Sequence, residues 1–223
     1  MNIIVMGGGL VGVATTWYLL EGGHSVTLLD RATELASEAS HANGAMLDAS
    51  HPEPWNTPQA LGQLLRWMGR EDSPLLLRPA QLPRLMGWGL GFLRYSRPRH
   101  HARNTAVNAR LATYSLQRMR ELEAETAIDY TQAHNGILKI FRHPEEMETA
   151  RASSRLMADS GVRHETLSPA GISQREPALA DIQAELACGF FYPDDASGDA
   201  RLFCQRLGEK AVAQLLDAGL VES

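Results

Sequence analysis

The feature that most constrains this chain is a set of three glycines, Gly7, Gly9 and Gly12, spaced G-x-G-x-x-G directly after a short β-rich stretch. Residues 3–5 (IIV) have the composition of a buried parallel strand, and residues 10–20 supply an apolar helix. The stretch SVTLLD then forms a second strand that closes on Asp30. We therefore predict one βαβ unit over residues 2–30.

This strand–turn–helix context predicts a site for a dinucleotide pyrophosphate. The three glycines permit a tight turn, a close backbone approach and close helix–strand packing, and the helix start offers N–H groups to phosphates. Asp30 follows Gly12 by 18 residues and is placed to accept hydrogen bonds from ribose hydroxyls. Its carboxylate would repel a 2′-phosphate, although the neighbouring Arg31 could accept one. NADP is disfavoured, and FAD and NAD both remain open.

Residues 31–58 contain small and polar residues with turn formers, so we predict no third strand there. A nicotinamide-type domain would normally show another helix and strand at this point. The stretch SEASHANGAML suits a loop pressed against a ligand as well as it suits an exposed turn.

The chain from residue 60 to residue 97 reads as short helices interrupted by prolines, with Met86, Trp88, Phe92 and Tyr95 expected in core or interdomain packing. Asn104 is a suitable N-cap for a long helix that runs to about Glu125. Four apolar residues share one face of that helix: Val107, Leu111, Tyr114 and Leu122.

The second half has the composition of an α+β region. AIDYTQAHNGILKIFRH reads as two strands around a turn at Asn135-Gly136, and a helix runs from Pro144 to Gly161. VRHETLS and CGFFYPDD read as further strands. We place a domain boundary near residue 85, which divides the chain into residues 1–85 and 86–223.

Composition excludes several classes of protein. The net charge of -5 gives no reason to expect a nucleic-acid partner, and two cysteines form neither a disulfide framework nor a metal-ligand set. No export signal and no membrane-spanning apolar run is recognisable, so we expect a cytoplasmic protein. The cluster RYSRPRHHAR could contact a membrane surface or form a solvated basic face.

The opening unit and SHANGAML resemble the FAD-dependent amino-acid oxidoreductases, the family of D-amino acid oxidase, glycine oxidase and sarcosine oxidase, and within it the bacterial D-amino acid dehydrogenases (small subunit). The resemblance continues, in the family's order, through PWNTP, RLATYSLQRMRELEAETAIDY, NGILKIFR, REPAL and YPDDASGDARLFCQRL. One departure is that His41 stands where the family commonly has an aromatic residue, and Gly44 comes one place earlier than the family glycine.

The resemblance implies an α/β fold, in which a Rossmann-like FAD-binding βαβ start is interleaved with an antiparallel α+β substrate domain. Residues 1–85 would form the N-terminal part of the FAD-binding domain, and residues 86–223 would form a substrate-binding region that is incomplete at its C-terminus. The implied FAD-binding residues are Val5, Gly7, Gly8, Gly9, Leu10, Val11, Gly12, Asp30, Arg31, Ser40, Asn43, Gly44 and Ala45.

The implied reaction is oxidation of a D-amino acid to a 2-oxo acid and ammonia. Electrons would pass to a respiratory acceptor such as a quinone, with the protein peripheral on the inner face of the cell membrane. No catalytic residue and no metal ligand can be assigned, because the family's carboxylate-binding groups lie largely in a second half that this chain lacks. Alternatives are an inactive truncated remnant and a nicotinamide-dependent oxidoreductase.

Overall fold

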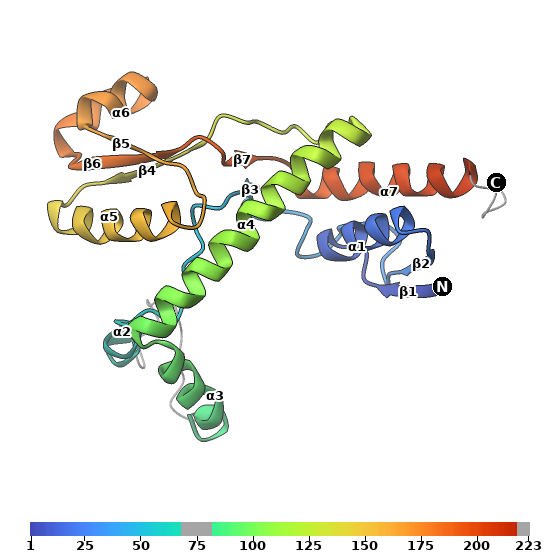
Figure 1. Cartoon of the computed structure of the whole chain (residues 1–223), viewed down its shortest axis with the longest axis horizontal. Coiled ribbons are helices and arrows are strands. Elements are labelled where there is room, and N and C mark those ends of the chain that lie inside the picture. Colours follow the sequence, from blue (N-terminus) through green and yellow to red (C-terminus); the bar gives the residue numbers. More distant parts are fainter. Residues whose placement is uncertain (68–81, 218–223) are drawn as a thin grey trace. The chain divides into compact units, whose positions relative to one another are not determined.

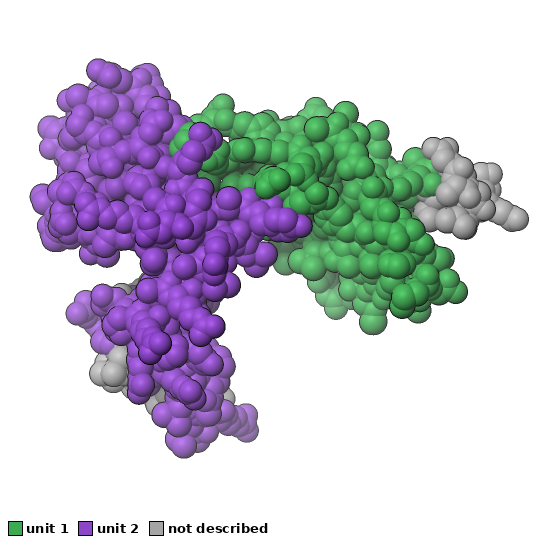
Figure 2. Space-filling model, viewed as in Figure 1, with its two compact units in different colours: residues 1–48, 115–137, 193–223 green, residues 49–114, 138–192 purple. Residues whose placement is uncertain are grey.

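The computed structural model describes residues 1–67 and 82–217, which divide into two compact units (Figure 2). Unit 1 combines residues 1–48 and 115–137 with the chain from residue 193 onward, and unit 2 combines residues 49–114 with 138–192. Each unit is therefore assembled from segments that are far apart in the sequence. The functional division near residue 85 stays a prediction.

Unit 1 begins with the predicted βαβ unit, which is confirmed. Strand β1 (Asn2–Met6) pairs in parallel with β2 (Ser25–Leu29), and helix α1 (Leu10–Glu21) connects them (Figure 1). The helix ends before Gly22 and Gly23, and Gly23 adopts a φ of +74° that suits glycine. The glycine motif therefore lies in the turn between β1 and α1.

The core of unit 1 is built mainly between α1 and helix α7 (Ala200–Asp217), which lie side by side in Figure 1. Its buried side chains are Val13, Trp17, Leu20, Ala36, Leu122, Ile128, Tyr130, Phe203, Cys204, Leu207 and Ala211. Apolar side chains on the opposite face of the β1–β2 pair, Ile4, Met6 and Leu29, remain exposed. One face of this small sheet is thus covered and the other is open.

A two-residue strand contradicts the expectation that residues 31–58 contain none. Strand β3 (Met46–Leu47) pairs antiparallel with β7 (Ala196–Ser197), so it does not extend the β1–β2 sheet. The predicted hairpin at Asn135-Gly136 is also wrong in its first strand. Ala133 exchanges both backbone hydrogen bonds with Ser197, at 2.9 and 3.0 Å, so the segment before the turn pairs with a distant residue.

The long helix α4 (Pro98–Thr126) starts six residues before the predicted N-cap, so Asn104 lies in its interior. Proline fits the first turn of a helix, where its missing N–H has no intrahelical partner. Of the apolar residues predicted to share one face, Leu122 is buried in the unit 1 core, whereas Val107, Leu111 and Tyr114 are exposed.

Unit 2 contains a three-stranded sheet in the order β4-β6-β5. Strand β4 spans Ile137–Phe141, β5 spans Glu165–Leu167 and β6 spans Cys188–Tyr192, with β5 antiparallel to β6. Helix α5 (Pro144–Ala158), α6 (Pro169–Arg175) and a 3₁₀ helix (Pro177–Glu185) complete this part. The predicted strands in VRHETLS and CGFFYPDD and the helix that starts at Pro144 are confirmed.

Helices α2 (Ala60–Trp67) and α3 (Leu82–Tyr95) confirm the helical character of residues 60–97, of which 68–81 lie outside the described residues. The expectation of core packing is wrong for three of the four side chains named for it, and interdomain packing of these side chains stays a prediction. Met86 and Trp88 are each 65% exposed, and Tyr95 is 49% exposed.

Candidate functional site

The glycine loop between β1 and α1 has a shape that side chains would prevent. A Cβ added to Gly12 would lie 1.7 Å from the Gly7 carbonyl oxygen, and Gly7 itself has a φ of +104°. The loop is fixed to β2 by a 2.7 Å hydrogen bond from the Gly7 N–H to the Leu29 carbonyl. The loop leads directly into α1, whose first N–H groups have no intrahelical partner.

Asp30, directly after β2, is tied to this loop. Its Oδ2 accepts a 2.5 Å hydrogen bond from the Gly8 N–H, and its Oδ1 accepts a 2.7 Å bond from the Ala32 N–H. The backbone bonds from Ala32 and Gly8 lower the pKa of Asp30. The carboxylate is thus held ionised at the end of the strand, and its two oxygens keep lone pairs for a further donor.

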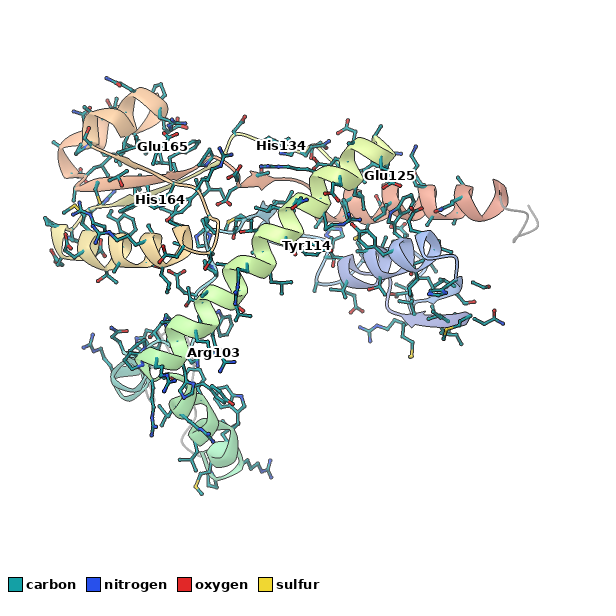
Figure 3. The ribbon with its side chains drawn as sticks, viewed as in Figure 1. Arg103, Tyr114, Glu125, His134, His164 and Glu165 are labelled. Carbon is teal, nitrogen blue, oxygen red and sulfur yellow. The ribbon has the colours of Figure 1, made fainter. Side chains whose placement is uncertain are left out.

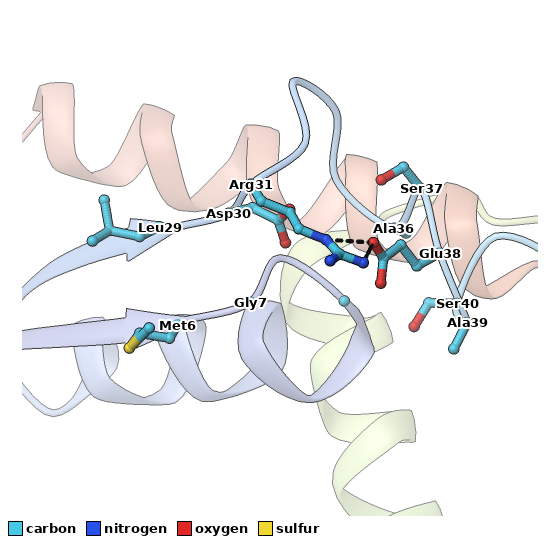
Figure 4. Close-up of a pocket in the computed structure, with 11 residues that line it drawn as sticks. Met6, Gly7, Leu29, Asp30, Arg31, Ala36, Ser37, Glu38, Ala39 and Ser40 are labelled. Carbon is cyan, nitrogen blue, oxygen red and sulfur yellow. Dashed lines mark hydrogen bonds and ion pairs between the residues drawn. The ribbon is translucent and has the colours of Figure 1, made fainter.

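Arg31 forms an ion pair with Glu38, donating from Nε at 2.7 Å and also from Nη2 (Figure 4). The hydrogen bond from Glu38 raises the pKa of Arg31. Because its charge is matched by Glu38, Arg31 does not stand as an unopposed cation beside Asp30.

The segment after Glu38 returns to the glycine loop. The Ser40 Oγ accepts a 3.1 Å hydrogen bond from the Leu10 N–H, the first residue of α1, and so caps the helix from a distance of 30 residues. Asn43 Oδ1 accepts a 2.8 Å bond from the Ala45 N–H, and Ala45 has a φ of +53°. SHANGAML therefore starts as part of the site and continues as a locally bonded turn.

These elements line an open cavity of about 570 Å³ beside the glycine loop (Figure 4). It is lined by Met6, Gly7, Gly9, Leu29, Asp30, Arg31, Ala36, Ser37, Glu38, Ala39 and Ser40. The volume lies within the range of about 300–1,000 Å³ that is usual for small-ligand sites.

The predicted cofactor residues divide into three groups by position. Gly7, Gly9, Asp30, Arg31 and Ser40 line the cavity. Gly8 and Leu10 do not line the cavity but donate backbone hydrogen bonds to Asp30 and Ser40, which do. Gly12 leaves room for the Gly7 carbonyl and so allows the shape of the loop. The remaining predicted residues, Val5, Val11, Asn43, Gly44 and Ala45, are not among the lining residues.

Sequence reasoning missed six lining residues: Met6, Leu29, Ala36, Ser37, Glu38 and Ala39. Met6 and Leu29 end the two paired strands, so their position could have been read from the predicted βαβ unit. Glu38 could not be read in this way, because its ion pair with Arg31 depends on the path of an irregular segment.

Several ionisable side chains outside the cavity have local contacts, among them His134 and His164, both labelled in Figure 3. His134 Nε2 lies 3.2 Å from Glu123 Oε2, and Glu123 also accepts a hydrogen bond from the Tyr130 hydroxyl. Burial, followed by the bond to Glu123, raises the pKa of Tyr130. In unit 2 the His164 ring lies 6.0 Å from the Phe190 ring. Within residues 1–67 and 82–217, no group of three or more His, Cys, Asp or Glu side chains could hold a metal ion.

Comparison with known proteins agrees with this geometry. Residues 2–216 match the family described as FAD dependent oxidoreductase. The chain is 42% identical over 215 residues to the D-amino acid dehydrogenase of Paramagnetospirillum magneticum and 37% identical over 217 residues to that of Dechloromonas aromatica. These alignments cover 96% and 97% of this chain and 51% and 52% of the two relatives. The chain thus spans about half the length of the curated relatives it matches.

Solved structures support the same fold. The L-proline dehydrogenase from P. horikoshii superposes with a TM-score of 0.66 at 16% identity, covering 96% of this chain and 42% of that one. Glycine oxidase from Geobacillus kaustophilus superposes with a TM-score of 0.57 at 20% identity, covering 96% of this chain and 44% of that one.

Proposed function

Because the chain belongs to the FAD-dependent oxidoreductase family, we propose that its glycine-loop cavity binds the ADP part of FAD and that it serves an enzyme oxidising D-amino acids. The substrate class rests on relatives of 35–42% identity that carry the name D-amino acid dehydrogenase. The single observation that carries the cofactor site is the joint placement of Asp30 and Ser40 on the glycine loop.

The residues around the cavity fit the phosphate and ribose parts of this cofactor. The absence of side chains at Gly7 and Gly9, which line the cavity, lets backbone approach a pyrophosphate, and the helix start of α1 favours negative charge. Asp30 would accept from a ribose hydroxyl with the lone pairs that Gly8 and Ala32 leave. The Arg31–Glu38 pair supports a ligand without a 2′-phosphate, which argues against NADP.

When bound, FAD supplies the acceptor for the hydride that leaves the substrate Cα. The role proposed for the described residues is to bind and orient the cofactor's ADP end. Holding the substrate carboxylate calls for an arginine in fork geometry, and no described arginine is assigned to it. The proposed substrate oxidation therefore belongs to the whole protein.

Competition between nucleotides tests the cofactor site. In a fluorescence titration of the purified chain with FAD, we expect ADP to displace FAD. FMN, which lacks the AMP part of FAD, should leave FAD bound. The substitution Asp30→Asn should weaken FAD binding about tenfold, since an amide offers one accepting oxygen instead of two.

Asp181→Asn, on the exposed 3₁₀ helix of unit 2, removes the same charge and is the matched control. Displacement by FMN as effective as by ADP, or equal FAD affinity for Asp30→Asn and wild type, would contradict the proposed site. For the whole protein, D-amino acids but not their L-enantiomers should bleach the bound flavin.

We further propose that α3 and the start of α4 contact an anionic membrane surface, which would place the enzyme near a respiratory electron acceptor such as a quinone. Residues 82–103, which cover α3 and the start of α4, contain five arginines and no Asp or Glu, in a chain whose net charge is -5. Within this range α3 exposes Met86, Trp88 and Leu90. Exposed apolar side chains beside basic ones are typical of helices that lie in a membrane interface. None of the helices in the described ranges is long and apolar enough to cross a membrane.

A further inference from the structure

Helix α7 contacts the segment of residues 34–41 at two points, although about 160 residues separate them in the sequence. This segment, which we call the site loop, supplies Ala36, Ser37, Glu38, Ala39 and Ser40 to the cavity wall. We infer that Arg201 and Gly208 of α7 are positioning residues that fix the site loop against the glycine loop. Only the consequence for FAD rests on the proposed function; the positioning itself does not.

The first point of contact is a notch that holds Leu35. A Cβ added to Gly208 would lie 2.4 Å from Leu35 Cδ1, and a Cβ added to Gly8 would lie 2.7 Å from Leu35 Cδ2. The Leu35 side chain is therefore wedged between α7 and the glycine loop, in space that two missing side chains provide. Gly8 thus has a packing role, in addition to its hydrogen bond with Asp30.

The second point of contact is the guanidinium of Arg201, which contacts both ends of the site loop. Its Nη2 donates to Glu34 Oε2 at 2.8 Å, and its Nη1 lies 2.7 Å from His41 Nε2. A planar guanidinium can serve two acceptors at once in fixed directions, which an ammonium group cannot. His41, the residue that departs from the family pattern, is thus a hydrogen-bond partner of Arg201.

Between these two ends the site loop is tied to the glycine loop. The Ala36 N–H donates a 2.9 Å hydrogen bond to the Gly8 carbonyl, and Ala36 is 3% exposed with a φ of +55°. Such a left-handed conformation is costly for alanine and persists where surrounding contacts enforce it. Ser40, one residue before His41, reaches the Leu10 N–H at the start of α1. Loss of the α7 contacts should therefore loosen the cavity wall from both ends.

Hydrogen exchange in the chain without added nucleotide tests the positioning directly. In peptides covering residues 34–41, Arg201→Gln should exchange backbone amides about fivefold faster than wild type, because hydrogen bonds to charged groups are lost. Arg206→Gln is the matched control, since Arg206 lies on the same helix and pairs with Glu209 at 3.2 Å. Equal exchange in wild type and Arg201→Gln would overturn the inference.

Gly208→Ala tests the Leu35 notch and keeps the inference falsifiable if Arg201→Gln fails to fold. Alanine favours a helix over glycine, so a purely structural role of α7 predicts an unchanged or higher melting temperature and unchanged FAD affinity. We expect the melting temperature to be kept while the Kd for FAD rises about tenfold, because the added methyl group displaces Leu35. The double variant Leu35→Val with Gly208→Ala should restore the Kd, since valine lacks the Cδ atoms.

The two measurements separate the two proposals. Faster exchange in Arg201→Gln, in a chain that binds no FAD, would support the positioning and reject the proposed cofactor site. Full FAD affinity in both Arg201→Gln and Gly208→Ala, with wild-type exchange of the site loop, would reject the positioning and leave the cofactor site standing.

Discussion

At the scale of single residues, the site is prepared by contacts within the protein. Asp30 holds the glycine loop by a bond to Gly8, and Ser40 caps α1 at Leu10. Contacts within the protein alone hold both side chains in place. Preorganisation of this kind lowers the cost of ordering side chains on binding.

Cys204 of α7 is fully buried in the unit 1 core, and burial raises its pKa to about 11 from an ordinary value of 9.0. The folded state therefore retains the thiol proton at a pH where the unfolded state loses it. Stability from this group is fully present below pH 9 and is lost as the pH rises towards about 11. We predict that unfolding free energies measured in urea fall less steeply over this range in Cys204→Ala than in wild type.

Cys188 of β6 provides the comparison for this prediction. Burial raises the pKa of its thiol as well, but by less than that of Cys204, and the nearby charge of Arg151 opposes the effect. Cys188→Ala should change the pH slope less than Cys204→Ala does. The explanation fails if wild type and Cys204→Ala show parallel stability curves between pH 9 and 11.

At the scale of elements, two helical glycines differ in whether the fold leaves space for a side chain. In α1 an added Cβ at Gly12 would meet the Gly7 carbonyl oxygen at 1.7 Å, whereas at Gly62 in α2 it would meet no atom within 4 Å. Gly12→Ala should therefore cost about 3 kcal/mol or more in unfolding free energy, because backbone must move. Gly62→Ala should be neutral or stabilising by up to about 1 kcal/mol, since alanine favours the helix.

Chemical denaturation of the two alanine variants beside wild type checks this contrast. Gly12→Ala should also lose the affinity for FAD that Gly62→Ala keeps. A Gly12→Ala chain as stable as wild type would show that the β1–α1 turn relaxes without cost, against the geometry of the glycine loop.

The elements also differ in how well local sequence predicts them. The βαβ unit and α5 carry their own signals, namely glycine spacing, Pro144 at the helix start and apolar periodicity. The predicted hairpin before Gly136 and the N-cap at Asn104 were wrong. Ala133 pairs with Ser197, and helix α4 already starts at Pro98. Both predictions were made from a few neighbouring residues. The residue that pairs with Ala133 and the residue that starts α4 lie outside those stretches.

At the scale of the whole chain, positive charge is concentrated between residues 82 and 103, where five arginines lie without an acidic residue. We predict that the protein sediments with vesicles containing anionic lipid and not with neutral ones, and that added salt releases it. The triple substitution of Met86, Trp88 and Leu90 by Gln should weaken this binding about tenfold or more, because apolar contact is lost.

Val212→Gln, an exposed apolar position on α7 in unit 1, is the control for that triple variant. Equal binding to neutral and anionic vesicles, or unchanged binding of the triple variant, would reject the proposed membrane surface. Binding of a soluble protein partner with no vesicle binding would assign the surface to protein recognition instead.

The βαβ unit, the glycine loop, the position of Asp30 after β2 and the family could be predicted from the residues alone, because each depends on residues close together or on motifs in a fixed order. Three features became visible only in the folded chain: Glu38 pairs with Arg31, Ser40 caps α1, and Arg201 and Gly208 contact the site loop. These contacts depend on how an irregular segment crosses the glycine loop and on where a helix from the far end of the chain packs. Neither the path of such a segment nor long-range packing leaves a periodic or spaced signal in the sequence.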